Sequence, residues 1–300
     1  MPLPPIETRI QTLLAPASAL AKGDDIIWKG HGFIWKAPET WMPQMTAWLE
    51  PRFRSAGWKK LSPGKFRDIT CDDTEWLEVL QDCLKVDLDT CIDDLTAALA
   101  GARLWTYHGC RTEDAGLYFR DGLQRHDRQT MTRRLYDLVD GHETLAWLKP
   151  SLEQKIARTD NTIDLGRLYV VVDDDFMIET AGHYLIYGSE WILAVLGQAA
   201  HQVLKSIGVP TLLEIDLPLD AVASGDRREF AADLLMEWTR RACNVTDWHT
   251  PLNFTFCLEQ DIPPAWIVGH SHPARIEDQF DDFRAYVSPR STCRHCEPQS

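Results

Sequence analysis

The sequence predicts an α+β protein with a mostly helical, aromatic-rich N-terminal region. Two observations predict this class. Before residue 101, tryptophan and phenylalanine side chains crowd between Trp28 and Trp58, with prolines among them, and two helical patterns follow. After residue 101, short β-branched runs alternate with helical patterns, which is typical of α/β and α+β domains. We therefore expect an N-terminal region over 1–100, a main domain over 101–285 and a flexible tail over 286–300.

Composition and charge argue against a membrane protein and against a general nucleic-acid-binding protein. The chain has 300 residues, of which 44% are hydrophobic and 25% are charged, as in ordinary globular proteins. No apolar run approaches the roughly 20 residues that span a bilayer, and no basic segment precedes an apolar block at the N-terminus. We expect a cytoplasmic protein with reduced cysteines and no membrane partner. The net charge of −14 argues against broad non-specific nucleic-acid binding, although several arginines between residues 103 and 134 could form a local basic groove.

The N-terminal region carries a dense aromatic cluster followed by two helices. The patterns DDTEWLEVLQDCL and DTCIDDLTAALAG have apolar residues at helical spacing, and Gly101 is a suitable stop. The aromatic side chains could line a ligand groove, but side chains of this kind more often form the core of a small domain.

The expected main domain alternates strands and helices. The strand patterns are LWTYH, RLYVVVDDD, PTLLEIDLPL and NFTFCLEQDIPPAWIVG. Between them, TEDAGLYFRDGL, residues 178–208 and DRREFAADLLMEWTRRAC have helical patterns, with Gly182 and Gly188 able to break the second. The Gly-rich fingerprints of Rossmann and P-loop proteins are absent from the sequence.

The first strand ends in Tyr107-His108-Gly109. A histidine at a strand end can project into a cleft, and a following glycine lets a ligand approach the backbone closely. The alternative is a half-buried histidine beside a turn. Arg111 could pair with phosphate oxygens through its planar fork, or be a surface residue near a helix start.

The order of several motifs matches one family. YHGCRTEDAGLYFRDGL resembles the first strand and helix of ADP-ribosyltransferases of the diphtheria-toxin and poly-ADP-ribose-polymerase type. GRLYVVVDDDFMIETAGHYL resembles the strand and the tyrosine-bearing helix that follow, and FCLEQDIPPAWIVG resembles the closing strand with its turn. The resemblance covers roughly residues 102–272.

The resemblance implies a split β-sandwich that takes NAD as a substrate and transfers ADP-ribose. It implies that His108 holds NAD, and that Tyr184 stacks on the nicotinamide ring with Tyr187 as its competitor. The residues implied to bind NAD are Tyr107, His108, Gly109, Arg111, Tyr169 and Tyr187.

The family's catalytic glutamate is missing from its usual position. That position, at the start of the closing strand, reads Asn253-Phe254-Thr255-Phe256. A carboxylate is needed because nicotinamide leaves through an oxocarbenium-like state whose positive charge must be stabilised. We expect Glu190 to supply it, or else Glu259, which gives His108, Tyr184, Glu190 and Glu259 as the candidate catalytic residues.

The most direct hypothesis is a mono-ADP-ribosyltransferase that modifies a macromolecule, either protein or nucleic acid. By resemblance it could be a toxin of a toxin–antitoxin or anti-phage system, with an antitoxin or regulator as a partner. Two alternatives remain open. One is a non-catalytic module that binds NAD or ADP-ribose, and the other is an RNA 2′-phosphotransferase-like enzyme that uses Arg111 and the arginines of 120–134.

A metal site is a separate hypothesis. His270 and His272 together with Cys293 and Cys296 could supply a tetrahedral zinc ion. A single Cys-x-x-Cys also arises readily by chance, and the C-terminal segment is polar. We therefore assign no metal ligand from the sequence alone.

Overall fold

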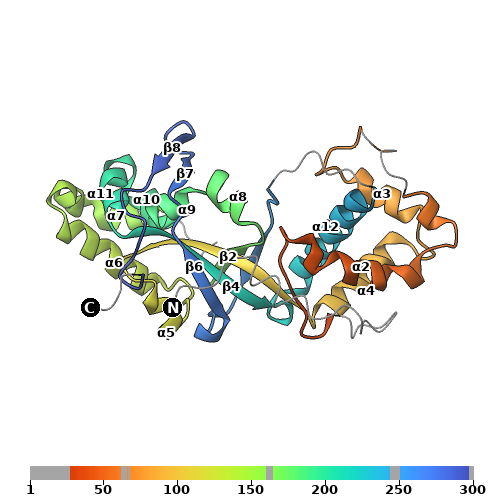
Figure 1. Cartoon of the computed structure of the whole chain (residues 1–300). Helices are drawn as coiled ribbons and strands as arrows, with labels where there is room; N and C mark the ends of the chain where they lie inside the picture. Colours follow the sequence, from red (N-terminus) through yellow and green to blue (C-terminus); the bar gives the residue numbers. More distant parts are fainter. Residues whose placement is uncertain (1–27, 62–65, 67, 160–164, 244–250, 297–300) are drawn as a thin grey trace. The chain divides into compact units, whose positions relative to one another are not determined.

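The computed structural model describes residues 28–61, 66, 68–159, 165–243 and 251–296 (Figure 1). Helices and strands are mixed along the chain, as the predicted α+β class requires. The chain divides into two compact units. The first contains the described residues up to 105 together with those of 216–254, and the second contains 106–215 and those from 255 onward.

This division differs from the two consecutive domains expected from the sequence. Helix α12 (Ser224–Ala242) belongs to the first unit, where it packs against α3 (Glu75–Gln81) and α4 (Leu88–Leu99). Phe230, Leu234, Leu235 and Trp238 form its buried face. A helical pattern predicts that such a face is buried, but it does not tell which part of the chain covers it.

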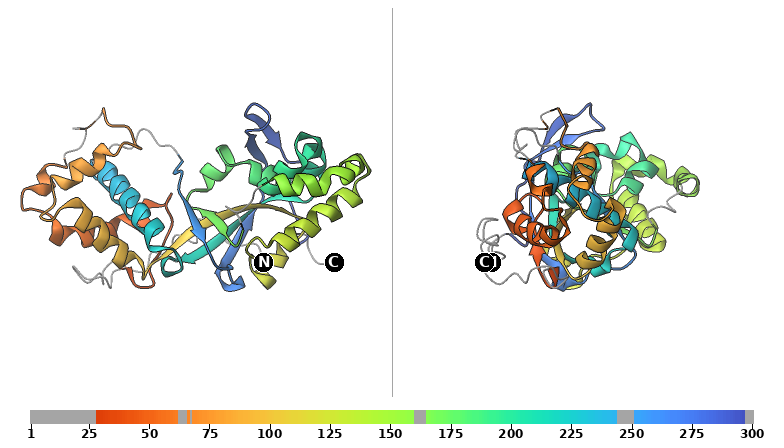
Figure 2. Two further views of the ribbon diagram at one scale, coloured as in Figure 1. Left: turned by 180° about the vertical axis from the view of Figure 1, so that it is seen from behind. Right: turned by 90° about the vertical axis from the view of Figure 1, so that its right-hand side faces the viewer.

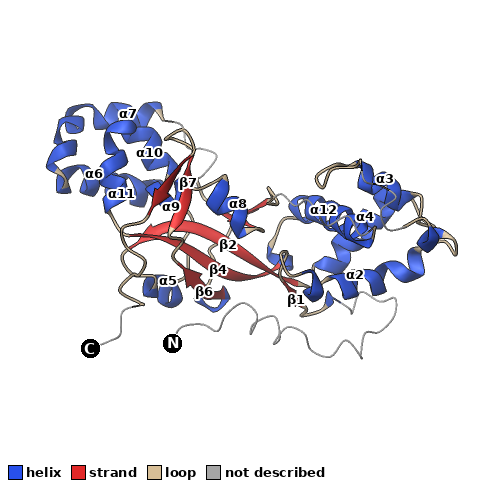
Figure 3. Ribbon diagram, turned by 45° about the horizontal axis from the view of Figure 1, so that its top comes forward, coloured by secondary structure: helices blue, strands red, loops and turns tan. Residues whose placement is uncertain are grey.

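The first unit is almost entirely helical (Figure 3). Its other elements are β1 (Gly32–Phe33), η3 (Pro38–Thr40), α2 (Met42–Leu49), η4 (Glu50–Arg52), η5 (Gly57–Lys59) and η8 (Leu219–Ala221). The aromatic cluster forms the core, because Trp28, Trp41, Trp48, Trp76 and Trp238 are at most 1% exposed. Trp58, at 39% exposed, is an exception.

The second unit is built on a sheet with the strand order β5-β3-β2-β4-β6. The strands are β2 (Arg103–Thr112), β3 (Leu168–Val171), β4 (Val209–Pro218), β5 (Thr255–Leu258) and β6 (Ile267–Ser271). β2 and β4 each continue from one unit into the other. The pairs β2–β3, β3–β5 and β4–β6 are antiparallel.

Short helices follow the strands of this unit. They are α5 (Gly116–Asp121), α6 (Arg128–Gly141), η6 (Glu143–Ser151), α7 (Leu152–Arg158), α8 (Asp174–Glu179), α9 (His183–Tyr187), α10 (Glu190–Leu196), η7 (Gln198–Ala200), α11 (His201–Ser206) and η9 (Pro264–Trp266). The helical pattern over 178–208 is interrupted at Gly188 and Gly197, whose φ angles are +86° and +70°. A left-handed residue ends a helix, and glycine adopts that conformation without a Cβ penalty.

Two of the motifs recognised in the sequence lie against each other. α5 ends at Gly122, and Leu123 exchanges two backbone hydrogen bonds of 2.9 Å with Ile262 of the Ile-Pro-Pro turn. Gly122 has φ +76°, and a Cβ placed on it would lie 2.3 Å from the Ile262 carbonyl oxygen. The glycine is therefore required both by its backbone conformation and by this close approach.

A separate hairpin of β7 (Arg275–Asp278) and β8 (Arg284–Val287) packs on α8 and α9 (Figure 2). The chain beyond it was expected to be a flexible tail, but Arg290 and Cys293 contact the unit, while most other residues of 288–296 are exposed. Cys293 is 2% exposed beside Ala115 and Val209, and Arg290 forms an ion pair of 3.0 Å with Glu113. Residues 297–300 lie outside the described part of the chain. None of the described helices has the length and apolar character needed to cross a membrane.

Candidate functional site

A cavity of about 530 Å³ lies in the second unit, within the size range of small-molecule sites. β2, β3, α6, α8 and the α9–α10 corner contribute its lining. Five of the residues singled out in the sequence border it, and they are His108, Gly109, Arg111, Tyr169 and Tyr184. Glu190 borders it as well.

His108 projects from β2 into this cavity. Its Nδ1 donates a hydrogen bond of 2.8 Å to the carbonyl oxygen of Tyr169 on β3. Burial lowers the pKa of His108 to about 4, so the ring is neutral near pH 7. Because Nδ1 carries the proton, Nε2 offers a lone pair. His108 can therefore accept a hydrogen bond from a hydroxyl or amide of a bound ligand.

Tyr184 and Glu190 meet across the break between α9 and α10. Gly188 ends α9, and the side chain of Ser189 caps α10 by accepting from Ile192 N. Glu190 is the first residue of α10, and its Oε2 accepts a hydrogen bond of 2.7 Å from the Tyr184 hydroxyl. The carboxylate lies at the edge of the cavity, since its side chain is 54% exposed.

His183 supports this carboxylate from the protein side. Its Nε2 lies 3.8 Å from Glu190 Oε2, longer than a hydrogen bond, and its Nδ1 accepts a hydrogen bond from the Gln279 amide on the segment between β7 and β8. With Nδ1 as an acceptor, a neutral ring carries its proton on Nε2, toward Glu190. His183 and the Tyr184 hydroxyl together lower the pKa of Glu190 to about 2, so that Glu190 is ionised at neutral pH.

Three other residues from the sequence hypothesis do not border the cavity. The Glu259 side chain is 77% exposed and lies 3.8 Å from Arg167. Tyr187, the alternative to Tyr184 for stacking on nicotinamide, is buried in the protein interior, and its hydroxyl donates a hydrogen bond of 2.7 Å to Asp278. Tyr107, beside His108 on a strand that alternates its side chains, is 4% exposed. Of the two candidate carboxylates, only Glu190 shares the cavity with His108.

Arg111 borders the cavity, but its side chain serves the fold. Its guanidinium donates to the carbonyl oxygens of Ile207, Lys205, Gly208 and Leu185 at 2.8, 2.8, 2.9 and 3.3 Å. Three of these carbonyls lie at or just after the C-terminus of α11, where helix geometry leaves carbonyls without intrahelical partners. The arrangement leaves few donors for the phosphate that we expected Arg111 to bind.

Gly109 allows α8 to pack closely on β2. A Cβ at this position would lie 2.7 Å from Sδ of Met177, and Met177 also borders the cavity. The close approach that the sequence predicted for a ligand is made here by a side chain of the protein itself.

Arg134 borders the cavity from α6. The sequence placed it only in a group of arginines, those of 120–134, and gave it no role in NAD binding. Within the described residues, no hydrogen bond or ion pair engages its exposed guanidinium. Thr130 and Met131 border the cavity from the same helix, at i−4 and i−3. The spacing predicts from the sequence that these three residues share one face of a helix. It does not predict that this face meets the cavity. Arg125, another cation of the lining, is bonded to Asp261 and to the Glu259 carbonyl.

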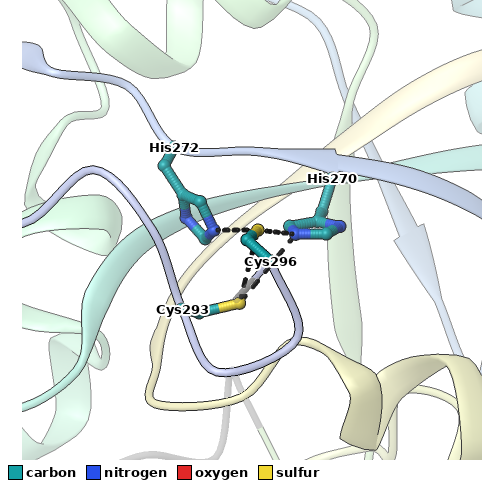
Figure 4. Close-up of side chains that lie close together, drawn as sticks. All are labelled: His270, His272, Cys293 and Cys296. Carbon is teal, nitrogen blue, oxygen red and sulfur yellow. Dashed lines mark hydrogen bonds between the residues drawn. The ribbon is translucent and has the colours of Figure 1, made fainter. Parts of the chain in front are cut away.

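The structure also gathers the four residues left open as zinc ligands. One ligand atom from each of His270, His272, Cys293 and Cys296 lies within 4.8 Å of the others (Figure 4). None of these four residues borders the cavity.

Comparisons with protein-family models, with curated proteins and with solved structures returned no match.

Proposed function

We propose that the chain is an NAD-dependent mono-ADP-ribosyltransferase whose second unit is a split β-sandwich of that family. The observation that carries the proposal is the shared cavity of His108, Tyr184 and Glu190. His108 lies far from the other two in the sequence. The resemblance implies NAD binding for His108 and nicotinamide stacking for Tyr184, and we expect Glu190 to supply the carboxylate that is missing from the family's usual position. A chance likeness of short motifs would not require them to border one cavity.

Glu190 supplies the negative charge that the reaction needs. In the reaction, the bond between the nicotinamide nitrogen and C1′ of the ribose breaks, a nucleophile of the acceptor bonds to C1′, and the acceptor loses its proton. An ionised carboxylate at this position stabilises the positive charge that develops on the ribose. With a pKa of about 2, Glu190 carries this charge throughout the physiological range.

His108 and Tyr184 hold the substrate. The neutral imidazole presents Nε2 as an acceptor for a ribose hydroxyl or for the carboxamide N–H. The Tyr184 ring offers an aromatic face while its hydroxyl is engaged with Glu190. Ring and carboxylate are thus fixed relative to each other before the substrate binds.

Arg134 is the residue we assign to the pyrophosphate. It is an exposed cation at the cavity that makes no hydrogen bond to any other described residue, whereas the donors of Arg111 are used by backbone carbonyls. An arginine fork pairs well with phosphate oxygens. The cavity volume of about 530 Å³ is also compatible with a ligand of dinucleotide size.

Nicotinamide release tests the proposal. The purified chain is incubated with NAD, alone and with cell lysate treated with either nuclease or protease, and free nicotinamide is measured by chromatography. Release that is lost in His108→Ala supports the proposal, and the treatment that abolishes stimulation identifies the acceptor class. If the chain binds NAD but releases no nicotinamide under any condition, the transferase proposal is wrong. The chain is then the non-catalytic module that binds NAD or ADP-ribose.

One observation favours a second candidate, RNA 2′-phosphotransfer. Arg134 gives the cavity lining a cation that suits a phosphate of a nucleic acid, and Arg125 also borders the cavity, in an ion pair with Asp261. This function requires a 2′-phosphorylated RNA, so it predicts consumption of NAD only when such an RNA is added. Release with phosphate-free acceptors would exclude it.

A further inference from the structure

We propose that His270, His272, Cys293 and Cys296 bind one structural zinc ion that fastens the C-terminal segment to the sheet. His270 lies on β6 and His272 just after it, while the two cysteines lie in the turn that follows β8. Figure 4 shows the two imidazoles and the two sulfurs pointing toward a common centre.

The distances fit a tetrahedral ion. With Zn–S bonds of about 2.3 Å and Zn–N bonds of about 2.0 Å, tetrahedral coordination separates two sulfurs by about 3.8 Å and a sulfur from a nitrogen by about 3.5 Å. The two sulfurs are 3.8 Å apart. The sulfur–nitrogen distances are 3.1 Å from Cys296 to His270, 3.4 Å from Cys296 to His272 and 3.9 Å from Cys293 to His270.

The distance between the sulfurs of Cys293 and Cys296 excludes a disulfide between them. A bonded pair of sulfurs lies about 2.05 Å apart, and both cysteines are free thiols here. Two thiols and two imidazoles that converge on one point without a disulfide form a donor set that coordinates metal.

The surroundings prepare the ligands for a cation. His272 donates from Nδ1 to the Pro210 carbonyl oxygen at 2.9 Å, which leaves Nε2 with its lone pair toward the cysteines. Metal-binding histidines commonly have a second-shell acceptor of this kind. The backbone N–H of Ala115 donates to Cys293 Sγ at 3.4 Å, a contact that stabilises a thiolate.

Zinc is the metal that this donor set selects. Two thiolates and two imidazoles in a tetrahedron are typical of structural zinc sites, and hard cations such as Mg²⁺ and Ca²⁺ prefer oxygen ligands. All four positions are filled by the protein. We therefore infer a structural role and not a catalytic one.

The site closes a loop that supports the candidate active site. Between His272 and Cys293 the chain forms the β7–β8 hairpin, from which Gln279 binds His183 and Asp278 binds Tyr187 and Lys205. The hairpin also meets the start of α9 closely, because a Cβ at Gly182 would lie 2.3 Å from the Glu277 carbonyl oxygen. Loss of the ion would loosen the hairpin and, through Gln279, the support of His183.

Metal analysis tests the site independently of any activity. The full chain is purified under reducing conditions, supplied with Zn²⁺ and freed of loosely bound metal, and its zinc content is measured. We expect one zinc per chain. Cys296→Ser is the principal variant because Cys296 is exposed and its replacement should not disturb folding. We expect it to weaken zinc binding by at least about 100-fold, whereas Cys257→Ser, a half-buried control on β5, should retain the metal.

Cobalt substitution tests the geometry. Co²⁺ in this site should give the intense visible bands of tetrahedral coordination with thiolate charge transfer, and Cys296→Ser should abolish or strongly alter them. A wild-type chain with reduced thiols that holds no stoichiometric zinc would overturn the proposal. Equal zinc affinity in Cys296→Ser and Cys257→Ser, or a weak octahedral cobalt spectrum, would overturn it too.

Discussion

The Tyr184 hydroxyl donates a 2.7 Å hydrogen bond to Oε2 of Glu190 across the break between α9 and α10. The break exists because Gly188 takes a φ of +86° and Ser189 then caps α10. Backbone geometry thus brings an aromatic ring and a carboxylate to the same edge of the cavity. In our proposal, the ring binds nicotinamide and the carboxylate stabilises the ribose cation.

Tyr184→Phe should separate these two roles. The ring remains, so we expect the affinity for NAD to change by less than about threefold. The hydrogen bond that orients Glu190 is lost, and a hydrogen bond to a charged group contributes roughly 1.5 kcal/mol, so nicotinamide release should slow by about tenfold. Tyr136→Phe, on α6 and outside the cavity lining, is the control. A Tyr184→Phe enzyme with an unchanged rate would show that the hydroxyl does not orient Glu190.

Substitution of Arg111 should lower stability, whereas substitution of Arg134 should weaken NAD binding. Arg111→Lys leaves several backbone carbonyls without their donor, so the free energy of unfolding should fall by about 2–4 kcal/mol in a urea titration. Arg134→Gln should change that free energy by less than about 0.5 kcal/mol but weaken NAD binding roughly tenfold. Arg133→Gln, a neighbour outside the cavity lining, should leave both quantities unchanged. Weaker NAD binding in a stable Arg111→Lys protein would return the phosphate role to Arg111.

Gly122→Ala should be strongly destabilising. Its φ of +76° is costly for alanine, and the added Cβ would collide with the Ile262 carbonyl. We expect a loss of about 2–3 kcal/mol in the free energy of unfolding. Gly141→Ala is the control, since nothing lies within 4 Å of a Cβ there. That change should be neutral, or stabilising by up to about 1 kcal/mol. Similar effects of the two substitutions would contradict the contact between Gly122 and the Ile-Pro-Pro turn.

The lowered pKa of His108 predicts a pH dependence of stability. The folded-state pKa of about 4 lies below the usual 6.5, so the unfolded chain binds a proton first as the pH falls. The resulting stability is fully present above pH 6.5 and is lost as the pH falls through about 4. At about 1.36 kcal/mol per pH unit, the loss could reach about 3 kcal/mol. His108→Asn removes this titration, so the difference in unfolding free energy between wild type and variant should change between pH 7 and pH 4. A constant difference would contradict a buried neutral imidazole.

The sequence predicted secondary structure better than tertiary neighbours. The patterns around β2, β3, β4 and α12 specify their types because periodicity is local. The partner of α12 was not predictable, since an amphipathic face can be covered by any apolar surface. Glycine positions were informative for the same local reason, as Gly188 and Gly122 show.

For the candidate site, too, the sequence predicted individual residues better than their tertiary neighbours. Motif order pointed to His108 and Tyr184, whereas Glu190 was proposed because the family's glutamate is missing from its usual position. All three border one cavity. Arg111 was assigned to phosphate because the sequence does not reveal which carbonyls lack partners. The pairs His270/His272 and Cys293/Cys296 each have ligand spacing, but only the tertiary structure brings the pairs together.

Nicotinamide release by Glu190→Gln, compared with Glu259→Gln, tests the central claim most directly. The substitutions are isosteric, and both carboxylates are exposed enough for the protein to stay folded. We predict that Glu190→Gln lowers the rate of release by at least about 100-fold while NAD still binds, and that Glu259→Gln changes it by less than about twofold. A Glu190→Gln protein that releases nicotinamide at the wild-type rate would contradict the account.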